Sequence, residues 1–264
     1  MSAKSKTTSR NKNKTTTTGK KIFKLILAML LLSALLGSGT ALIAWLGRTL
    51  FSANPHFILH GVDTNSIGYW DGRNREVEAV LGLKLNEDNL FALDLRKIKK
   101  QLIAIPNIKD ASVERILPDI IRLQLEERIP RAEIAGTNFV IDNSTVIIPR
   151  SYFQGRFPII AGLDRNFKLI PGKDIPELQP VIDLIMTRVK YFPEFELNEV
   201  WISHSNRILF TTTYKNSQYK VYFPRKQDFN HSFMQLREGI ETNIRNRIKA
   251  VSYDLTNKAR IISR

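Results

Sequence analysis

The stretch that decides the fold runs from Ile105 to Pro130 and reads IPNIKDASVERILPDIIRLQLEERIP. Two runs of alternating residues flank a Leu117-Pro118-Asp119 turn, and in the second run apolar and polar side chains alternate strictly from Ile121 to Glu126. Alternation with period two predicts strands with one buried and one wet face. We therefore expect a β-hairpin with strands Ala111–Leu117 and Ile120–Arg128, joined by a type I turn.

Upstream of this hairpin the spacing of apolar residues predicts one strand and two helices. The strand is expected at Phe57–Val62 and the first helix at Arg75–Gly82. Asp94 is a suitable N-cap for a second helix over Leu95–Ala104, which Pro106 ends. The order β-α-α-β-β predicts an α+β domain over residues 57–130, with both helices on one face of a three-stranded sheet.

Downstream of Pro130 the pattern changes to short strands with two helices among them. We expect residues 131–264 to form a second, sheet-rich α+β domain. Its expected helices are Glu177–Val189 and Phe229–Ile248, and its expected strands are Phe139–Ile141, Val146–Ile148, Phe157–Ile160, Val200–Ser203, Ile208–Tyr214, Tyr219–Phe223, Val251–Leu255 and Lys258–Ser263.

The N-terminal part predicts a membrane anchor. Residues 22–46 form an apolar run interrupted by one charge, Lys24. As a helix this run is roughly 37 Å long, enough to cross a hydrocarbon core of about 30 Å. Residues 1–21 form a basic tail of disordered composition, and residues 47–56 form a linker to the first domain. Because eight of the 40 basic residues lie within residues 1–24, which hold no acid, we expect a cytoplasmic tail and an exported C-terminal part.

Two features of this apolar run leave alternatives open. Gly39-Thr40-Ala41 fits the cleavage site of a signal peptide, although the apolar run continues to Leu46, beyond a typical signal-peptide core. Small residues recur at helical spacing within the run, and they allow either close packing of another helix or plain contact with lipid: Ser33, Gly37, Ala41 and Ala44.

Composition and motifs argue against several other functions. The net charge of +15 is concentrated in the tail, and the remaining residues carry 32 basic and 25 acidic groups with mixed signs, unlike a nucleic-acid-binding face. Cysteine is absent and the four histidines lack placeable carboxylate partners, so we expect no disulfide and no metal. Neither a catalytic constellation nor a phosphate-binding glycine loop is found, and we expect no enzyme, no cofactor and no small-molecule substrate.

A family resemblance emerges from several of these segments together. NLFALDL at 89–95, IPNIKDASVER at 105–115, LPD at 117–119 and EERIP at 126–130 resemble the POTRA domain of the bacterial division family FtsQ, also called DivIB. FVIDNSTVI at 139–147 and FPIIAG at 157–162 are similar to segments of that family's second domain. The loop at 66–73 is longer than is usual there, and DLTNKARI at 254–261 departs from the family pattern by a missing aromatic residue.

The resemblance implies a function that involves no catalysed reaction. It implies a single-pass inner-membrane protein at the division septum that links early and late division proteins, with FtsB-like and FtsL-like partners. It also implies that the end of the second domain offers a strand edge to the partner, here at Tyr253, Thr256, Asn257, Lys258, Ala259, Arg260, Ile261 and Ile262. Alternatives are a POTRA-bearing docking factor for export or assembly, and an exported hydrolase.

Overall fold

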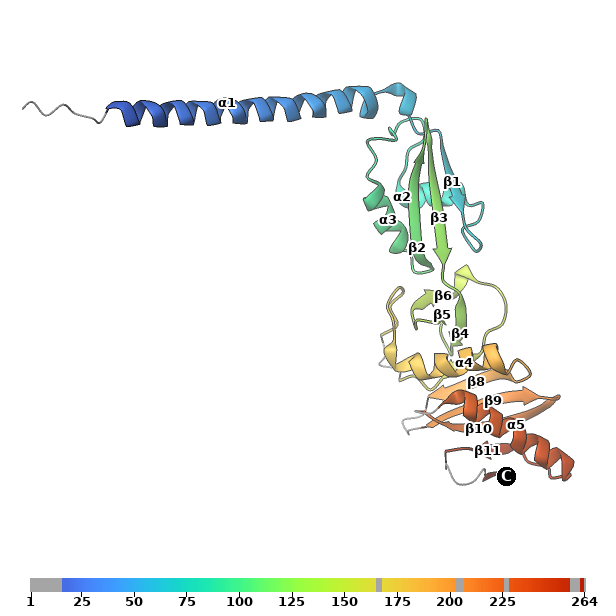
Figure 1. Ribbon diagram of the computed structural model, residues 1–264. Helices are drawn as coiled ribbons and strands as arrows, with labels where there is room; N and C mark the ends of the chain where they lie inside the picture. The colour runs from blue at the N-terminus through green and yellow to red at the C-terminus, as the bar shows by residue number, and fades with distance from the viewer. Residues whose placement is uncertain (1–15, 165–167, 203–206, 226–227, 257–261, 264) are drawn as a thin grey trace, which may run out of the picture.

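The computed structural model describes residues 16–164, 168–202, 207–225, 228–256 and 262–263. A long helix leads into a three-stranded sheet, which is followed by a nine-stranded sheet, as Figure 1 shows from blue to red. The expected α+β class is confirmed. We name the two folded parts after their sheets, the three-stranded unit and the nine-stranded unit.

The N-terminal helix α1 spans Thr16–Gly47 and continues into one π-helical segment, η1, at Arg48–Ser52. The stretch Ile22–Ser52 is long and apolar enough to cross a membrane, with a mean hydropathy of 2.2 and none of its best window buried against the protein. It is the single helix of this kind among the described residues. Its apolar side chains are exposed, as expected for groups that face lipid.

The three-stranded unit has the expected element order. Its sheet has the order β1-β3-β2, with β1 parallel and β2 antiparallel to β3. Its core joins α2 and α3 to one face of that sheet. The bounds are β1 Gly61–Asn65, α2 Asn74–Leu81, α3 Leu95–Ile103, β2 Ile108–Ile116 and β3 Ile120–Glu127.

Local chemistry explains where the helices of this unit begin and end. The Asp94 carboxylate accepts hydrogen bonds from the backbone N–H groups of Arg96 and Lys97, so the expected N-cap of α3 is confirmed. Helix α2 ends at Leu81 because Gly82 adopts a left-handed conformation with φ 66°, which glycine accepts without steric cost.

One expectation in this unit is wrong in detail. The first strand was expected at Phe57–Val62, but β1 occupies Gly61–Asn65, and Phe57 lies in the short 3-10 helix η2 at Pro55–Phe57. The reason is local pairing: the backbone of Leu59 bonds to Asp88 and Asn86 in the loop after α2, and not to the sheet. The hairpin turn contains a cis Leu117–Pro118 peptide bond.

The nine-stranded unit has the strand order β12-β11-β10-β9-β8-β7-β4-β5-β6. Most bounds differ from expectation by one to four residues. They are β4 Pro130–Ile134, β5 Phe139–Asp142, β6 Ile147–Pro149, η3 Arg150–Tyr152, β7 Ile159–Ala161, η4 Pro176–Leu178, α4 Gln179–Tyr191, β8 Glu196–Ile202, β9 Arg207–Tyr214, β10 Ser217–Pro224, α5 Phe229–Arg245, β11 Ser252–Asp254 and β12 Ile262–Ser263.

Strand β4 is an element that the sequence analysis missed. It follows β3 almost directly and lies inside the second sheet, antiparallel to β5 and parallel to β7. Its Ala132 and Ile134 are buried in the core of the nine-stranded unit. Because only two residues separate β3 from β4, the two sheets are joined by a very short connection.

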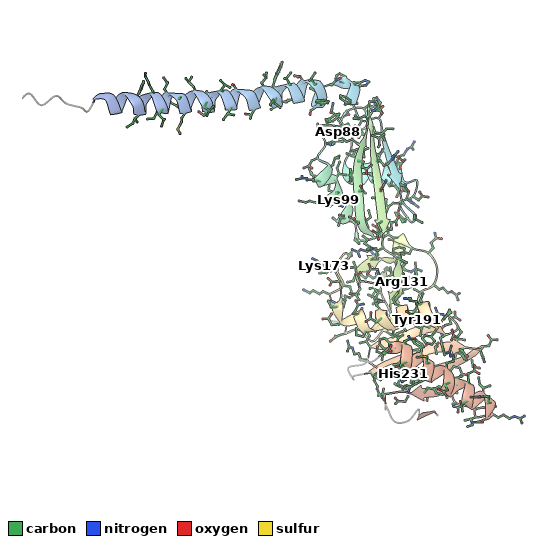
Figure 2. All side chains as sticks on the ribbon, viewed as in Figure 1. Asp88, Lys99, Arg131, Lys173, Tyr191 and His231 are labelled. Atoms are coloured by element: carbon green, nitrogen blue, oxygen red, sulfur yellow. The ribbon has the colours of Figure 1, made fainter. Side chains whose placement is uncertain are left out.

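The core of the nine-stranded unit lies between its sheet and the helices α4 and α5. Buried apolar residues alternate with more exposed ones along β9 and β10, as expected for a sheet covered on one face. Four phenylalanines form a packed aromatic cluster with ring centroids 4.9 to 5.9 Å apart in their closest pairs: Phe195, Phe210, Phe223 and Phe233. Figure 2 shows His231 on α5 and Tyr191 at the end of α4, both outside this core.

Candidate functional site

The outermost pair of strands at one side of the nine-stranded sheet forms the candidate site. Strand β11 runs parallel to β10, and β12 returns antiparallel to β11. The described register pairs Tyr253 with Ser263 and Asp254 with Ile262. In the described part of the chain β12 has no neighbour on its other side, so this side of the sheet presents unpaired backbone groups.

A local hydrogen-bonded motif lies at the end of β11. Thr256 donates from its backbone N–H to Asp254 Oδ1 at 2.9 Å and from its hydroxyl to the same oxygen at 2.5 Å. Such a side-chain-to-backbone turn ends a strand and favours reversal of the chain. Residues Asn257, Lys258, Ala259, Arg260 and Ile261, which we expected at the partner edge, lie outside the described residues.

Tyr253 serves the core of the unit with its side chain. The ring is 1% exposed and packs edge-on against Tyr219, with ring centroids 5.8 Å apart. Its hydroxyl oxygen accepts a hydrogen bond from Asn243 Nδ2 of α5 at 2.9 Å. Burial raises the pKa of Tyr253, and the nearby Tyr219 raises it further. Tyr253 lies in β11, which β12 separates from the open side of the sheet, so a strand added beside β12 would not meet this ring.

The four small residues that we expected at a helix-packing face all lie in α1. The Ser33 hydroxyl donates a hydrogen bond to the Leu30 carbonyl at 2.9 Å, so its polar group is satisfied within the helix. A Cβ added to Gly37 would meet no atom within 4 Å. Ala41 and Ala44 are exposed. Contact of this face with another helix stays a prediction.

The sequence analysis missed a polar hub within the three-stranded unit, at the end of β3. The Glu127 carboxylate at the end of β3 accepts four hydrogen bonds. They come from the Ser66 hydroxyl at 2.5 Å, the N–H groups of Tyr69 and Trp70 at 2.9 Å each, and Asn107 Nδ2 at 3.2 Å. The indole Nε1 of Trp70 donates in turn to Asn107 Oδ1 at 3.0 Å. The hub therefore holds the long loop at 66–73 against the end of β3.

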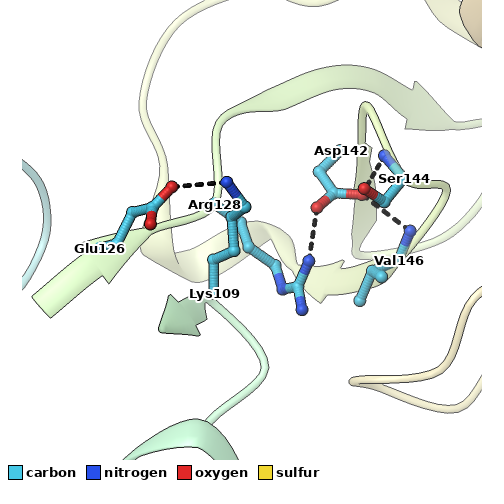
Figure 3. A network of polar contacts seen from close by, with 6 residues as sticks. All are labelled: Lys109, Glu126, Arg128, Asp142, Ser144 and Val146. Carbon is cyan, nitrogen blue, oxygen red and sulfur yellow. Dashed lines mark hydrogen bonds and ion pairs between the residues drawn. The ribbon is translucent and has the colours of Figure 1, made fainter. Parts of the chain in front are cut away.

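A separate polar contact joins the end of β3 to the nine-stranded unit. Arg128 Nη1 lies 2.7 Å from Asp142 Oδ2, and the Asp142 side chain is 0% exposed (Figure 3). The other oxygen of Asp142 accepts hydrogen bonds from the N–H groups of Ser144 at 2.8 Å and Val146 at 2.9 Å. A buried carboxylate with three donors is held in one position, so Arg128 has a fixed partner in the second unit.

Aromatic side chains complete this joint. Tyr152 of η3 packs edge-on against Tyr69 at a centroid distance of 4.9 Å and lies 6.3 Å from Trp70. Beside this contact lies an open cleft of about 1030 Å³, whose lining includes Ile67, Ile129, Phe153 and Phe157. No periodic pattern in the sequence predicts these contacts, because the residues that make them come from segments far apart in the chain. The unusual length of the 66–73 loop was the one feature of the sequence that pointed to them.

Groups suited to metal binding are not assembled in the described residues, which contain no cluster of three or more His, Cys, Asp or Glu side chains placed to hold an ion. Two of the four histidines, His56 and His60, are four positions apart in the sequence but have different surroundings. His56 is at η2, and His60 Nδ1 lies 3.2 Å from Asp119 Oδ2 of the hairpin turn.

Comparison with known proteins agrees with this architecture. A family model described as POTRA domain, FtsQ-type matches residues 73–128. The cell division protein FtsQ of Syntrophotalea carbinolica is 26% identical over 242 residues, which cover 87% of this chain and 80% of that protein.

Shorter matches reach higher identity. FtsQ of Koribacter versatilis is 31% identical over 129 residues, and the cell division protein DivIB of Clostridium tetani is 31% identical over 67 residues. The matches cover 46% and 25% of this chain, but only 37% and 25% of the lengths of those two relatives. By its element order, its match to the FtsQ-type POTRA model and these relatives, the chain is similar to the FtsQ/DivIB family of cell division proteins.

Proposed function

We propose that this protein is a membrane-anchored scaffold of the cell division machinery that links early and late division proteins through protein–protein contacts. Its role is structural and not catalytic. The FtsQ-type POTRA domain and the relatives named as division proteins support the cellular role. The open side of β12 supports the mode of action, because an unpaired strand edge accepts a partner strand through backbone hydrogen bonds.

The partners we propose are FtsB-like and FtsL-like membrane proteins of the same machinery. In this proposal the FtsB-like partner adds a strand beside β12 and extends the nine-stranded sheet. Lys258 and Arg260, which precede β12 in the sequence, favour an acidic partner segment. Backbone pairing depends little on side chains, so the missing aromatic residue near 254–261 does not weaken the proposal.

The location we propose is the bacterial inner membrane at the septum. In this proposal residues 1–21 are a cytoplasmic tail, and residues 57–130 and 131–264 are exported domains. Residues 47–56 connect the membrane helix to the first exported domain. The one long apolar helix among the described residues and the basic tail support this topology. A reporter that is active only outside the cytoplasm, fused after Arg264, is expected to be active. A silent fusion together with an active cytoplasmic reporter at the same position would show the opposite orientation.

A matched pair of proline variants tests the strand edge. Successive N–H groups of a strand point to opposite sides, so of Ile262→Pro and Ser263→Pro one removes a donor toward β11 and the other a donor toward the open edge. We expect the variant with the outward loss to keep the melting temperature of the wild type and to lose capture of the co-expressed FtsB-like protein. The other variant is expected to melt at a lower temperature.

The readouts are thermal melting and pull-down of the partner by each variant. If both variants capture the partner as well as the wild type does, the partner binds elsewhere and the proposed edge is wrong.

A further inference from the structure

The helix α1 is fastened to the three-stranded unit by specific contacts. Asn89 Nδ2 donates to the carbonyl oxygens of Phe51 at 3.1 Å and Asn54 at 2.9 Å. The ring of Phe51 packs against those of Phe57 and Phe91, with centroids 6.0 and 5.0 Å apart. Because η1 continues α1 without a break, these contacts set the direction in which the unit faces relative to the helix.

Helix α3 carries a row of unpaired cations on its exposed side. Its sequence, LRKIKKQLI, holds four basic residues and no acid. Ile98 and Leu102 are buried, and the opposite side presents Arg96, Lys97 and Lys100 to solvent. We call these three residues the α3 basic crest.

The charges of the crest are left without partners in the described part of the molecule. Lys99, outside the crest, pairs with Asp110 at 3.0 Å, whereas none of the crest residues forms an ion pair with a described residue. Arg96 and Lys100 are also four positions apart, where like charges repel across one helical turn. The arrangement therefore disfavours the helix slightly by itself and would gain from an external anionic surface.

The position of the crest points to the source of that surface. In Figure 1 the two units follow each other from top to bottom, and α1 extends to the left from the top of the first unit. Helix α3 lies on the left side of that unit, the side toward which α1 extends. In Figure 2 the label of Lys99 marks the same flank. A bilayer around α1 would therefore face the crest. Trp45 and Leu50, near this end of the helix, are 60% and 55% exposed, as suits residues at a membrane interface.

We propose that the α3 basic crest rests on anionic phospholipid headgroups of the leaflet from which the folded part emerges. Each basic side chain near such a surface favours the docked state by roughly fivefold. The attraction falls off within a Debye length of about 8 Å at physiological salt. It therefore requires the contacts of Asn89 and Phe51, which keep α3 close to the end of α1. The long Lys and Arg stems place the charges at headgroup level while the backbone stays outside the bilayer.

The experiment uses the full chain in lipid nanodiscs and exploits its lack of cysteine. A fluorophore is attached to Ala104→Cys, at the exposed C-cap of α3, or to Ser112→Cys, on the opposite, exposed face of the same sheet. Quenching by a lipid spin-labelled at its headgroup is measured in neutral discs and in discs with anionic phosphatidylglycerol. We expect several-fold stronger quenching at position 104 than at 112 in anionic discs, decreasing at about 1 M salt, where the Debye length is about 3 Å.

Two charge-reversal triples with equal change of net charge separate the crest from general charge effects. Arg96→Glu/Lys97→Glu/Lys100→Glu is expected to abolish the difference between positions 104 and 112. The control triple Arg245→Glu/Arg247→Glu/Lys249→Glu changes exposed residues at the end of α5, far from α1 in Figure 1, and is expected to leave it intact. Circular dichroism melting of each triple verifies that it is folded.

Three results would overturn the proposal. They are equal quenching at positions 104 and 112 in anionic discs, equal quenching at position 104 in neutral and anionic discs, and quenching at 104 that survives the crest triple in a folded protein. None of these results bears on the strand edge at β12, so the two proposals stand or fall separately.

Discussion

At the scale of single residues, Glu127 shows how one side chain in β3 organises a distant loop. Its carboxylate gathers donors from Ser66, Tyr69 and Trp70, about 60 positions earlier in the chain, and from Asn107. Four donors on one carboxylate leave it little freedom to move. Any atom added beside it must therefore displace the loop and not the carboxylate.

Gly68 tests this rigidity. A Cβ at Gly68 would lie 2.7 Å from Glu127 Cδ and Oε2, which is too close for a real contact. We expect Gly68→Ala to lower the free energy of unfolding by about 1–3 kcal/mol through overpacking. Gly61→Ala is the control, because its Cβ would meet only Ile120 at an ordinary 3.9 Å. Urea unfolding of the fragment after α1 measures both, and equal stability of the two variants would contradict a fixed carboxylate.

At the scale of elements, α5 is tied to the sheet that it covers by a polar contact at its exposed end. The Tyr214 hydroxyl of β9 donates to Glu241 Oε1 of α5 at 2.6 Å, and Lys215 Nζ lies 2.6 Å from the same oxygen. Burial raises the pKa of Tyr214 to about 12, and the Glu241 carboxylate adds to the shift. The hydrogen bonds from Lys215 and Tyr214 lower the pKa of Glu241.

This contact predicts a dependence of stability on alkaline pH. The folded-state pKa of Tyr214 lies above its unfolded value of 10.0, so its contribution is complete below pH 10 and is lost between pH 10 and about 12. We expect the melting temperature of the wild type to fall more steeply over this range than that of Tyr214→Phe. Tyr191→Phe, at a 52% exposed tyrosine, is the control and should follow the wild type. Parallel curves for wild type and Tyr214→Phe would show that this phenol does not titrate with unfolding.

At the scale of the whole molecule, the short connection between β3 and β4 does not by itself orient the two units. The contacts across it do: the Arg128–Asp142 ion pair and the packing of Tyr152 on Tyr69. The proposed scaffold, with a membrane anchor at one end and a strand edge at the other, would need such contacts, because they set where the edge stands relative to the membrane. The expectation of two successive α+β parts did not include these contacts.

Removal of one ring tests the joint. We expect Tyr152→Ala to broaden the distribution of distances between spin labels at Ser112→Cys in the first sheet and Lys173→Cys in the second unit, because the ring contact with Tyr69 is lost. Tyr191→Ala, which removes an exposed ring elsewhere, should leave the distribution narrow. Pulsed electron resonance measures both, and identical distributions would mean that the ion pair and connection alone orient the units.

Much of the architecture was readable from the sequence because it follows from local periodicity. The apolar run of α1, the alternation in β2 and β3 and the cap at Asp94 all act over a few residues, and each expectation came out close to the observed bounds. The edge position expected for the last strand agrees with the place of β12 in the sheet, whereas its binding of a partner remains to be tested.

Tertiary structure alone decided what depends on segments that are distant in the chain. The first strand lies at Gly61–Asn65 and not at Phe57–Val62, because residues 57–59 pair with the loop after α2. Tertiary structure also placed β4 between β5 and β7, turned the ring of Tyr253 into the core, and gathered the donors around Glu127. Such contacts have no period along the sequence, because the free energy that selects them comes from burial and hydrogen bonding between partners that meet only in the folded chain.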